Sequence, residues 1–300
     1  MRWWRAIMTD EVFTTFHRAV DQHFAERGEK LEWSDDKGMA VGPSGAQMGM
    51  GNLAQVCAQT DEAEWAKVIG EHFSRLDAAV AHASADERIS WDQVKSRLTI
   101  RLMANEAVPD HFRGNNVWRR DLQGVVTMLA IDYPDTVATV SRASAVDWGL
   151  PDEQLFDHAI GNLGTTFKLD APVVKELANG PLFLFSAEHF FAASHALLLK
   201  EMPECVGPFG AVVAIPTRHL ILCCPINTFD IVKDIGVMLN IAYKAETDGP
   251  GSITNQLYFY RDGTFDVIQS EVGEDQKLRL TPPPGLVQVL NDLEAASQES

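Results

Sequence analysis

Two apolar runs, Ala211–Ile215 and Leu220–Cys224, stand on either side of the polar insert Pro216–His219. Each run has about five residues and is rich in Val, Ile and Leu, a composition typical of strands buried on at least one face. A short polar connector that begins with Pro predicts a β-hairpin turn. No other stretch is as apolar, so we expect this hairpin to lie at the centre of the main sheet.

Apolar side chains repeat at helical spacing in several other stretches, which predicts amphipathic helices. The first helix begins after Thr9 or Asp10 and ends near Arg27. A longer helix begins near Asp61 and carries one apolar face, formed by Trp65, Ile69, Phe73 and Leu76. Shorter helices are expected over residues 53–57, 90–97, 151–162, 171–177, 186–200, 228–244 and 286–293.

Short alternating or apolar runs joined by turn residues predict further hairpins over residues 31–41, 124–140 and 257–268. Residues 42–51 and 105–120 are expected to be irregular. The pattern therefore predicts an α+β fold, with a mixed or antiparallel sheet whose hairpins are flanked by amphipathic helices. Charge density rises near Ala83–Arg88, which predicts an N-terminal α/β segment over residues 1–88 and a main α+β domain over residues 89–300. A single domain is the alternative.

The amino-acid composition argues against two classes of binding partner. The chain has 25 Lys and Arg against 42 Asp and Glu, a net charge of −17. This balance argues against nucleic acid and against anionic membrane surfaces, since both require clustered basic groups. No run of about eighteen apolar residues is present, so no transmembrane helix is expected. The first eight residues are too short for a secretion signal, and we expect a cytoplasmic protein.

The cysteines predict neither a metal site nor a disulfide framework. There are four, with no C-x-x-C spacing, and Cys223 and Cys224 are adjacent, so on a strand they face opposite sides. We expect all four to be buried thiols in a reducing compartment, with no metal and no cofactor bound.

The C-terminal two thirds of the chain resembles a known family. Gly210–Ile226, the helix after it and the strand pair around Arg261–Gly263 are similar to the C-terminal half of the YtpQ-like family of bacterial proteins. Arg119–Leu122, followed by the apolar run over 124–131, is similar to the middle strands of that family. The resemblance implies a shared α+β fold and a bacterial protein. It implies no activity, because the function of the family is unknown.

The candidate binding residues are Arg218 and His219, in the turn of the central hairpin. An arginine beside a titratable imidazole can bind a carboxylate or a phosphate, and binding residues favour loops on rigid scaffolds. The alternative is an exposed turn with Arg218 paired to a surface acid. Exposed Trp3 and Trp4 would instead indicate a surface that binds a partner.

No complete catalytic constellation is visible. Ser186 follows a predicted strand but lacks the glycines of a nucleophile elbow. His189 and His195 belong to a segment dominated by apolar residues, which indicates core packing. The first hypothesis is therefore a non-catalytic cytoplasmic module that binds a protein or a small anionic ligand. The alternative is a hydrolase or transferase whose site combines Arg218 and His219 with a carboxylate such as Glu188 or Asp262.

Overall fold

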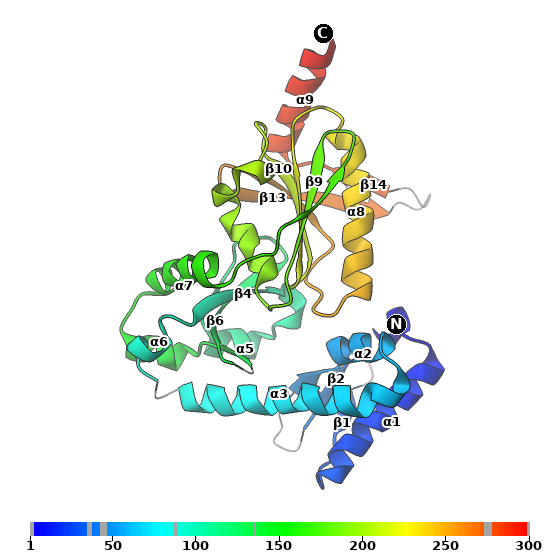
Figure 1. Ribbon diagram of the computed structural model, residues 1–300, viewed down its shortest axis with the longest axis vertical. Helices are drawn as coiled ribbons and strands as arrows, with labels where there is room; N and C mark the ends of the chain where they lie inside the picture. The colour runs from blue at the N-terminus through cyan, green and yellow to red at the C-terminus, as the bar shows by residue number, and fades with distance from the viewer. Residues whose placement is uncertain are drawn as a thin grey trace.

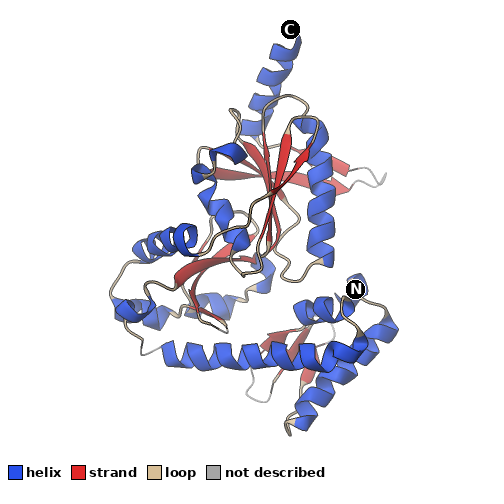
Figure 2. Ribbon diagram, in the orientation of Figure 1, coloured by secondary structure: helices blue, strands red, loops and turns tan. Residues whose placement is uncertain are grey.

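A computed structural model describes residues 3–34, 38–42, 47–86, 89–134, 136–272 and 278–298 (Figure 1). Helices accompany sheets whose strand pairings are all antiparallel in this part of the chain, so the fold is α+β as predicted (Figure 2). The chain forms three successive parts, each with its own sheet. We call them the N-terminal part (3–86), the middle part (89–166) and the C-terminal part (167–298).

The N-terminal part packs helices against a small three-stranded sheet. Thr9 begins its first helix as expected, because the Thr9 Oγ1 accepts the Val12 N–H at 3.3 Å. The prediction of a loop over 42–51 is wrong, since residues 47–49 form a strand that pairs with residues 39–41. Residues 35–37 of the hairpin predicted over 31–41 lie outside the described residues. The elements are η1 (Trp3–Ala6), α1 (Asp10–Glu26), β1 (Glu32–Ser34), β2 (Met39–Val41), β3 (Gln47–Gly49), α2 (Gly51–Ala58), η2 (Glu62–Glu64) and α3 (Trp65–Asp86).

Aromatic residues dominate the core of the N-terminal part. Phe16 and Phe73 are fully buried there and join α1 to α3. Trp4 is also buried, and its ring stacks on Phe13 with the ring centroids 3.8 Å apart. Trp4 is therefore a packing residue and not part of an exposed partner surface; the side chain of Trp3 lies outside the described set.

The middle part is built on the hairpin predicted over 124–140. Strand β6 pairs with β4 on one side and with β5 and β7 on the other. Helix α7 covers one face of this sheet and buries Leu155, Phe156 and Leu163 against it. The expected irregular segment 105–120 contains a short helix. The elements are α4 (Trp91–Val94), β4 (Leu98–Ala104), η3 (Asn105–Ala107), α5 (Asp110–Asn115), β5 (Trp118–Arg119), β6 (Val125–Asp132), β7 (Val137–Thr139), α6 (Arg142–Trp148) and α7 (Asp152–Thr166).

The C-terminal part contains a seven-stranded sheet in the order β14-β13-β12-β10-β11-β9-β8, so the predicted central hairpin does occupy its middle. Leu222 on that hairpin is fully buried. Helix α8 packs on the face that carries Val212 and Leu222. The elements are β8 (Val173–Glu176), β9 (Pro181–Ser186), η4 (Ala192–Glu201), η5 (Pro203–Cys205), β10 (Ala211–Thr217), β11 (Leu220–Pro225), α8 (Ile231–Asp248), β12 (Leu257–Arg261), β13 (Thr264–Val272), β14 (Leu278–Thr281) and α9 (Pro284–Gln298).

Two helix predictions in this part are wrong. The expected helix over residues 171–177 is instead the edge strand β8 (Val173–Glu176), because Pro172 disfavours helical backbone at Ala171 and the two valines after it favour a strand. Ser186 does not cap a helix: it ends β9, and the 3-10 helix η4 begins only at Ala192.

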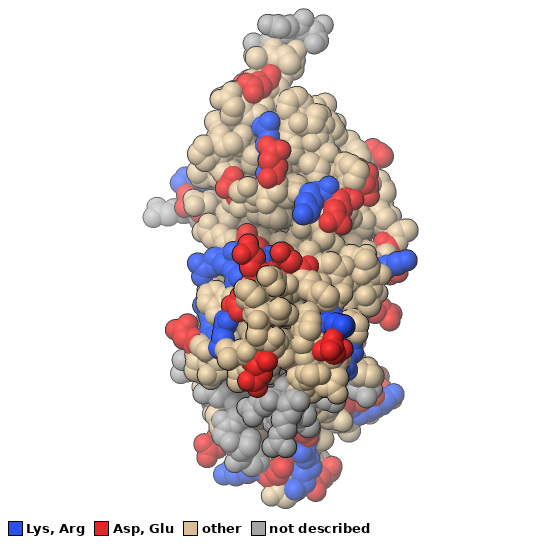
Figure 3. Space-filling model, turned by 90° about the vertical axis from the view of Figure 1, so that its left-hand side faces the viewer, with Lys and Arg blue, Asp and Glu red and all other residues tan. Residues whose placement is uncertain are grey.

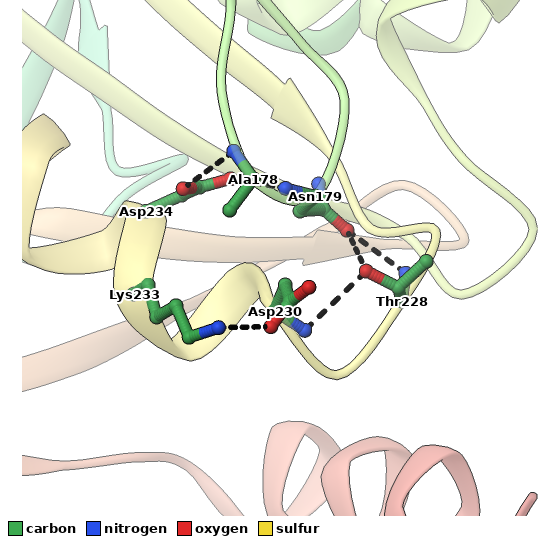
Figure 4. Close-up of polar contacts among 6 residues, drawn as sticks. All are labelled: Ala178, Asn179, Thr228, Asp230, Lys233 and Asp234. Atoms are coloured by element: carbon green, nitrogen blue, oxygen red, sulfur yellow. Dashed lines mark hydrogen bonds and ion pairs between the residues drawn. The ribbon is translucent and has the colours of Figure 1, made fainter. Parts of the chain in front are cut away.

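A buried carboxylate fixes α8 to the β8–β9 turn (Figure 4). Asp234 is 2% exposed and accepts the backbone N–H groups of Ala178 at 3.2 Å and Asn179 at 2.8 Å. The Asn179 Oδ1 in turn accepts the N–H groups of Asn227 and Thr228, each at 2.9 Å. These bonds supply partners for backbone groups that the loops would otherwise bury unpaired.

Candidate functional site

The turn of the central hairpin lies at the junction of the three parts. It contains Arg218 and His219, and both are half-buried rather than exposed at a free tip. The Arg218 N–H donates to the Gly251 carbonyl at 2.9 Å, and the Arg218 carbonyl accepts the Ala193 N–H at 3.1 Å. Gly251 also receives a contact from the N-terminal part, since its N–H donates to the Asn52 Oδ1 at 3.0 Å. The backbone of the turn is therefore held from two sides.

The Arg218 side chain is confined by its neighbours. The central carbon of its guanidinium lies 4.5 Å from the centre of the Phe190 ring, a cation–π geometry. A Cβ placed on Gly251 would lie 2.7 Å from the Arg218 Cδ, so the chain requires glycine there, where φ is also +79°. These contacts restrict the position of the guanidinium.

His219 is a neutral hydrogen-bond acceptor for its neighbour. The His219 Nδ1 lies 3.1 Å from the Ala187 carbonyl, which can only accept, so the proton is on Nδ1. The Nε2 is then free to accept the Arg218 Nε–H at 2.8 Å. Burial and, next, the positive charge of Arg218 lower the pKa of His219, which agrees with the neutral form.

Two other arginines lie close enough to act on Arg218. Burial, followed by the charges of Arg101 on β4 and Arg75 on α3, lowers the pKa of Arg218 to about 10. His72, one helical turn before Arg75, has its pKa lowered to about 4 by burial and then by Arg75 and Arg218. We call Arg75, Arg101 and Arg218, together with His72 and His219, the arginine cluster.

Arg101 and Arg218 lack a counter-charge. No ion pair formed by the described residues includes either of them. The Arg101 Nε is enclosed without a hydrogen-bond partner, and so is the Thr99 Oγ1, two positions earlier on the same face of β4. Arg75 differs, since it is exposed and pairs with Glu71 at 3.2 Å.

Several other arginines of the chain are paired with a carboxylate, in contrast to Arg101 and Arg218. Arg119 bonds Asp121 at 3.0 Å, and Arg142 bonds Asp152 at 2.6 Å. On the face drawn in Figure 3, basic and acidic side chains are likewise interspersed, and no broad area of described residues there carries basic groups alone. The excess positive charge is thus local and lies inside the junction.

The carboxylates considered for a catalytic site do not join Arg218 and His219. Glu188 is exposed and makes no hydrogen bond to His219 among the described contacts. Asp262 lies at the opposite end of the sheet, beyond the pairing of Ala211 with Tyr260, roughly 20 Å from Arg218 at the rise of a strand.

His195 is a packing residue. It is 6% exposed, and its ring nitrogens lie near the backbone carbonyls of Phe167 and Phe191. This agrees with the expectation of core packing for this segment.

Two hollows flank the hairpin turn. A groove of about 840 Å³ between the N-terminal part and α8 is lined by Thr217 and Leu220, the residues on either side of Arg218 and His219. A smaller cavity of about 250 Å³ is lined by Arg75 and Phe190, both neighbours of Arg218. Arg75 is the one residue of the arginine cluster that lines either of these two hollows.

Sequence reasoning proposed Arg218 and His219 as candidates and did not propose Arg75, Arg101 or His72. The available signal was Arg101 itself, a charge in the middle of a strand whose neighbours Ile100 and Leu102 are apolar. A charge at such a position must find a counter-charge, reach water or bind a ligand. No local sequence pattern indicates that His72 and Arg75 belong to the cluster, because their position depends on how α3 packs against the rest of the chain.

A metal site, a membrane-spanning helix or a known relative would also indicate a function. Within the described ranges, no three or more His, Cys, Asp and Glu side chains gather to hold a metal ion, and no helix is both long and apolar enough to cross a membrane. No family model, no protein of curated function and no solved structure matches the chain. The arginine cluster therefore carries the functional interpretation by itself.

Proposed function

We propose that the protein is a non-catalytic cytoplasmic module that binds a small anionic ligand at the arginine cluster. The observation that supports this is the pair Arg101 and Arg218, two half-buried arginines that no ion pair of the described residues includes, with the Nε of Arg101 buried without a hydrogen-bond partner. Burying an unpaired charge destabilises a fold by about several kcal/mol. Such a residue is most readily kept where a bound ligand offsets its charge.

The hydrogen-bond donors of the two arginines suit this role. Arg218 commits its Nε–H to His219, and its two terminal nitrogens make no hydrogen bond within the described structure. Arg101 commits none of its donors. A guanidinium presents its N–H groups as a planar fork that matches carboxylate or phosphate oxygens, so two arginines whose charges act on each other favour an anion with several oxygens.

The thiols agree with a reducing compartment. Cys57, Cys205, Cys223 and Cys224 are all free and buried. Burial raises the pKa of Cys57 to about 12 and that of Cys224 to about 11, so these sulfurs are poor nucleophiles. Inert buried thiols fit a cytoplasmic protein and give no support to a cysteine-based reaction.

Calorimetric titration with inorganic phosphate and with citrate at low ionic strength tests the proposal. We expect one site per chain, lost in Arg218→Gln and in Arg101→Gln. Arg261→Gln is the matched control, because Arg261 is an exposed arginine at the far end of the sheet. Binding that is absent in the native chain, or that is equal in all three variants, would reject the arginine cluster as an anion site.

A further inference from the structure

The larger hollow, of about 840 Å³, is a groove between α2 of the N-terminal part and α8 of the C-terminal part (Figure 1). Its volume falls in the range of about 300–1,000 Å³ that small-molecule sites occupy, and such sites favour the interfaces between parts of a chain. The lining residues Gln55 and Ala58 of α2 lie three positions apart, as do Ile241 and Lys244 of α8. Each helix therefore presents one face to the groove.

Hydrogen bonds hold the two walls of the groove together. The Gln55 Nε2 donates to the Thr247 carbonyl at 3.2 Å, and the Gln59 Nε2 donates to the Asp248 carbonyl. Both carbonyls belong to the last turn of α8, where a helix leaves its carbonyl groups without helical partners. The amide side chains of α2 therefore cap α8, and the groove beside them is formed before any ligand binds.

Two buried polar side chains in the lining each have an unused hydrogen-bonding group. Gln55 is 8% exposed; the Thr247 carbonyl can only accept, so the amide nitrogen faces it and the Oε1 makes no hydrogen bond to a described residue. Thr217 is 6% exposed, and its Oγ1 accepts the His219 N–H at 3.3 Å, which leaves its own O–H without an acceptor among those residues. One acceptor and one donor match the N–H and the C=O of a peptide group.

Two opposite charges on α8 also line the groove. Lys244 and Asp248 are four residues apart, about one helical turn, and no ion pair among the described residues includes either side chain. Four residues of helix rise about 6 Å, and an extended dipeptide spans about 7 Å. A dipeptide can therefore accept from the Lys244 ammonium with its carboxylate and donate to the Asp248 carboxylate with its amino group.

Contacts bring the polar and the charged lining residues together. The Gln55 Nε2 lies 3.4 Å from the Ser252 Oγ, and Ser252 forms a β-bridge with Thr217. A Cβ placed on Gly249, the residue after Asp248, would lie 3.1 Å from the Thr217 Cγ2. Gln55, Thr217 and the end of α8 therefore meet at one place in the groove.

Aliphatic side chains supply the apolar surface of the groove. Ile7, Leu220 and Ile241 line it, and its described lining includes no aromatic side chain. A ligand with aliphatic side chains removes this surface from water, which favours Leu, Ile or Val residues over polar ones. A flat aromatic ring gains no stacking partner here.

We propose that the groove binds a zwitterionic dipeptide of aliphatic residues, with its carboxylate at Lys244 and its amino group at Asp248. Its peptide group bonds Gln55 and Thr217, and its side chains contact the aliphatic wall. No residue of the arginine cluster lines the groove, so this is a second site, which goes beyond the proposed anion-binding function.

Calorimetric titration with five probes tests the ligand class. Leucyl-leucine carries every group that the groove recognises. Leucyl-leucine amide lacks the carboxylate, N-acetyl-leucyl-leucine lacks the charged amino group, glycyl-glycine lacks the aliphatic side chains, and decanoate lacks the peptide group. We expect leucyl-leucine to bind at one site per chain and each other probe to bind about tenfold or more weakly, the size of effect that one charge-assisted hydrogen bond or the burial of aliphatic side chains produces. Equal affinities of leucyl-leucine and its amide, tighter binding of decanoate, or no binding of leucyl-leucine would overturn the assignment.

Lys244→Gln ties the binding to this groove. It should weaken leucyl-leucine about tenfold and leave the affinity for the amide unchanged, because the amide has no carboxylate for Lys244 to bind. Lys200→Gln is the matched control, since Lys200 is exposed and does not line the groove. Equal losses in the two variants, or no loss in Lys244→Gln, would overturn the site. Unchanged phosphate binding in Lys244→Gln shows that the variant folds and separates a failure of this site from a failure of the arginine cluster.

Discussion

The Nε–H of Arg218 points at the Nε2 of His219 across 2.8 Å, so an arginine uses its own neighbour in the chain as an acceptor. A carboxylate would be the usual partner of a guanidinium, and none is present here among the described residues. The bond exists only while the imidazole is neutral, because a protonated ring has no lone pair to accept with. The hairpin turn is thus sensitive to protonation.

Stability should fall as the solution becomes acidic below neutral pH. The pKa of His72 is about 4 in the folded chain, and that of His219 is lowered as well, against about 6.5 for a free histidine. Between these values the unfolded chain binds more protons, so the free energy of unfolding rises with pH and the contribution is complete above about pH 7. Denaturant melts from pH 7 to pH 4 measure this slope.

His72→Gln is the diagnostic variant for this pH dependence. The substitution should reduce the pH dependence of the unfolding free energy between about pH 6.5 and pH 4, because burial and the arginines lower the pKa of His72 to about 4. His111→Gln serves as control, since His111 is exposed. A slope unchanged by His72→Gln would show that the titration arises elsewhere, for example at His23 or His195, whose pKa values are also lowered by burial.

Replacing Arg101 should stabilise the ligand-free protein. Arg101→Met removes an enclosed charge without a partner and keeps much of the side-chain volume, so we expect a gain of about 0.5–2 kcal/mol in unfolding free energy. Arg119→Met is the matched control; it breaks an ion pair with Asp121 at 3.0 Å and should destabilise. Urea titration compares the two. A marked loss of stability in Arg101→Met would mean that Arg101 has a structural partner.

The central hairpin and the long amphipathic helices could be predicted because their signals are local. Strands β10 and β11 are short apolar runs, and α1 carries Phe16 and Val20 at helical spacing. The segment 171–177 was mistaken for a helix, since its pairing with β9 is a contact that no local pattern reports. The same limit applies to the site: the turn residues were visible, but Arg101 and His72 reach them only through tertiary packing.

Strand β11 should be destabilised by any loss of buried side-chain volume. Leu222 is fully buried between the sheet and α8, so Leu222→Ala should cost about 2–5 kcal/mol through lost burial and the cavity it leaves. Thermal and urea melts measure this cost. A loss below about 0.5 kcal/mol would show that the hairpin is not core.

The carboxylate of Asp234, which holds α8 to the β8–β9 turn, should also contribute to the stability of the fold. Asp234→Ala leaves the buried backbone N–H of Asn179 without an acceptor, at a cost of about 1–3 kcal/mol, and also removes the acceptor of the part-buried Ala178 N–H. Asp230 is half-exposed and pairs with the exposed Lys233, so Asp230→Ala is the control variant with little expected change. Comparable melting temperatures for the two variants would contradict the role assigned to Asp234.

The central claim is that Arg101 and Arg218 form an anion site, and crystallography with an anomalous scatterer tests it most directly. Selenate is a tetrahedral analogue of phosphate. In crystals soaked with millimolar selenate at low ionic strength, we expect an anomalous peak within about 4 Å of both guanidinium groups, the reach of a charge-assisted hydrogen bond plus one oxygen. A cluster free of selenate while other sites are occupied, or carboxylates paired with both arginines in the unsoaked crystal, would contradict the claim.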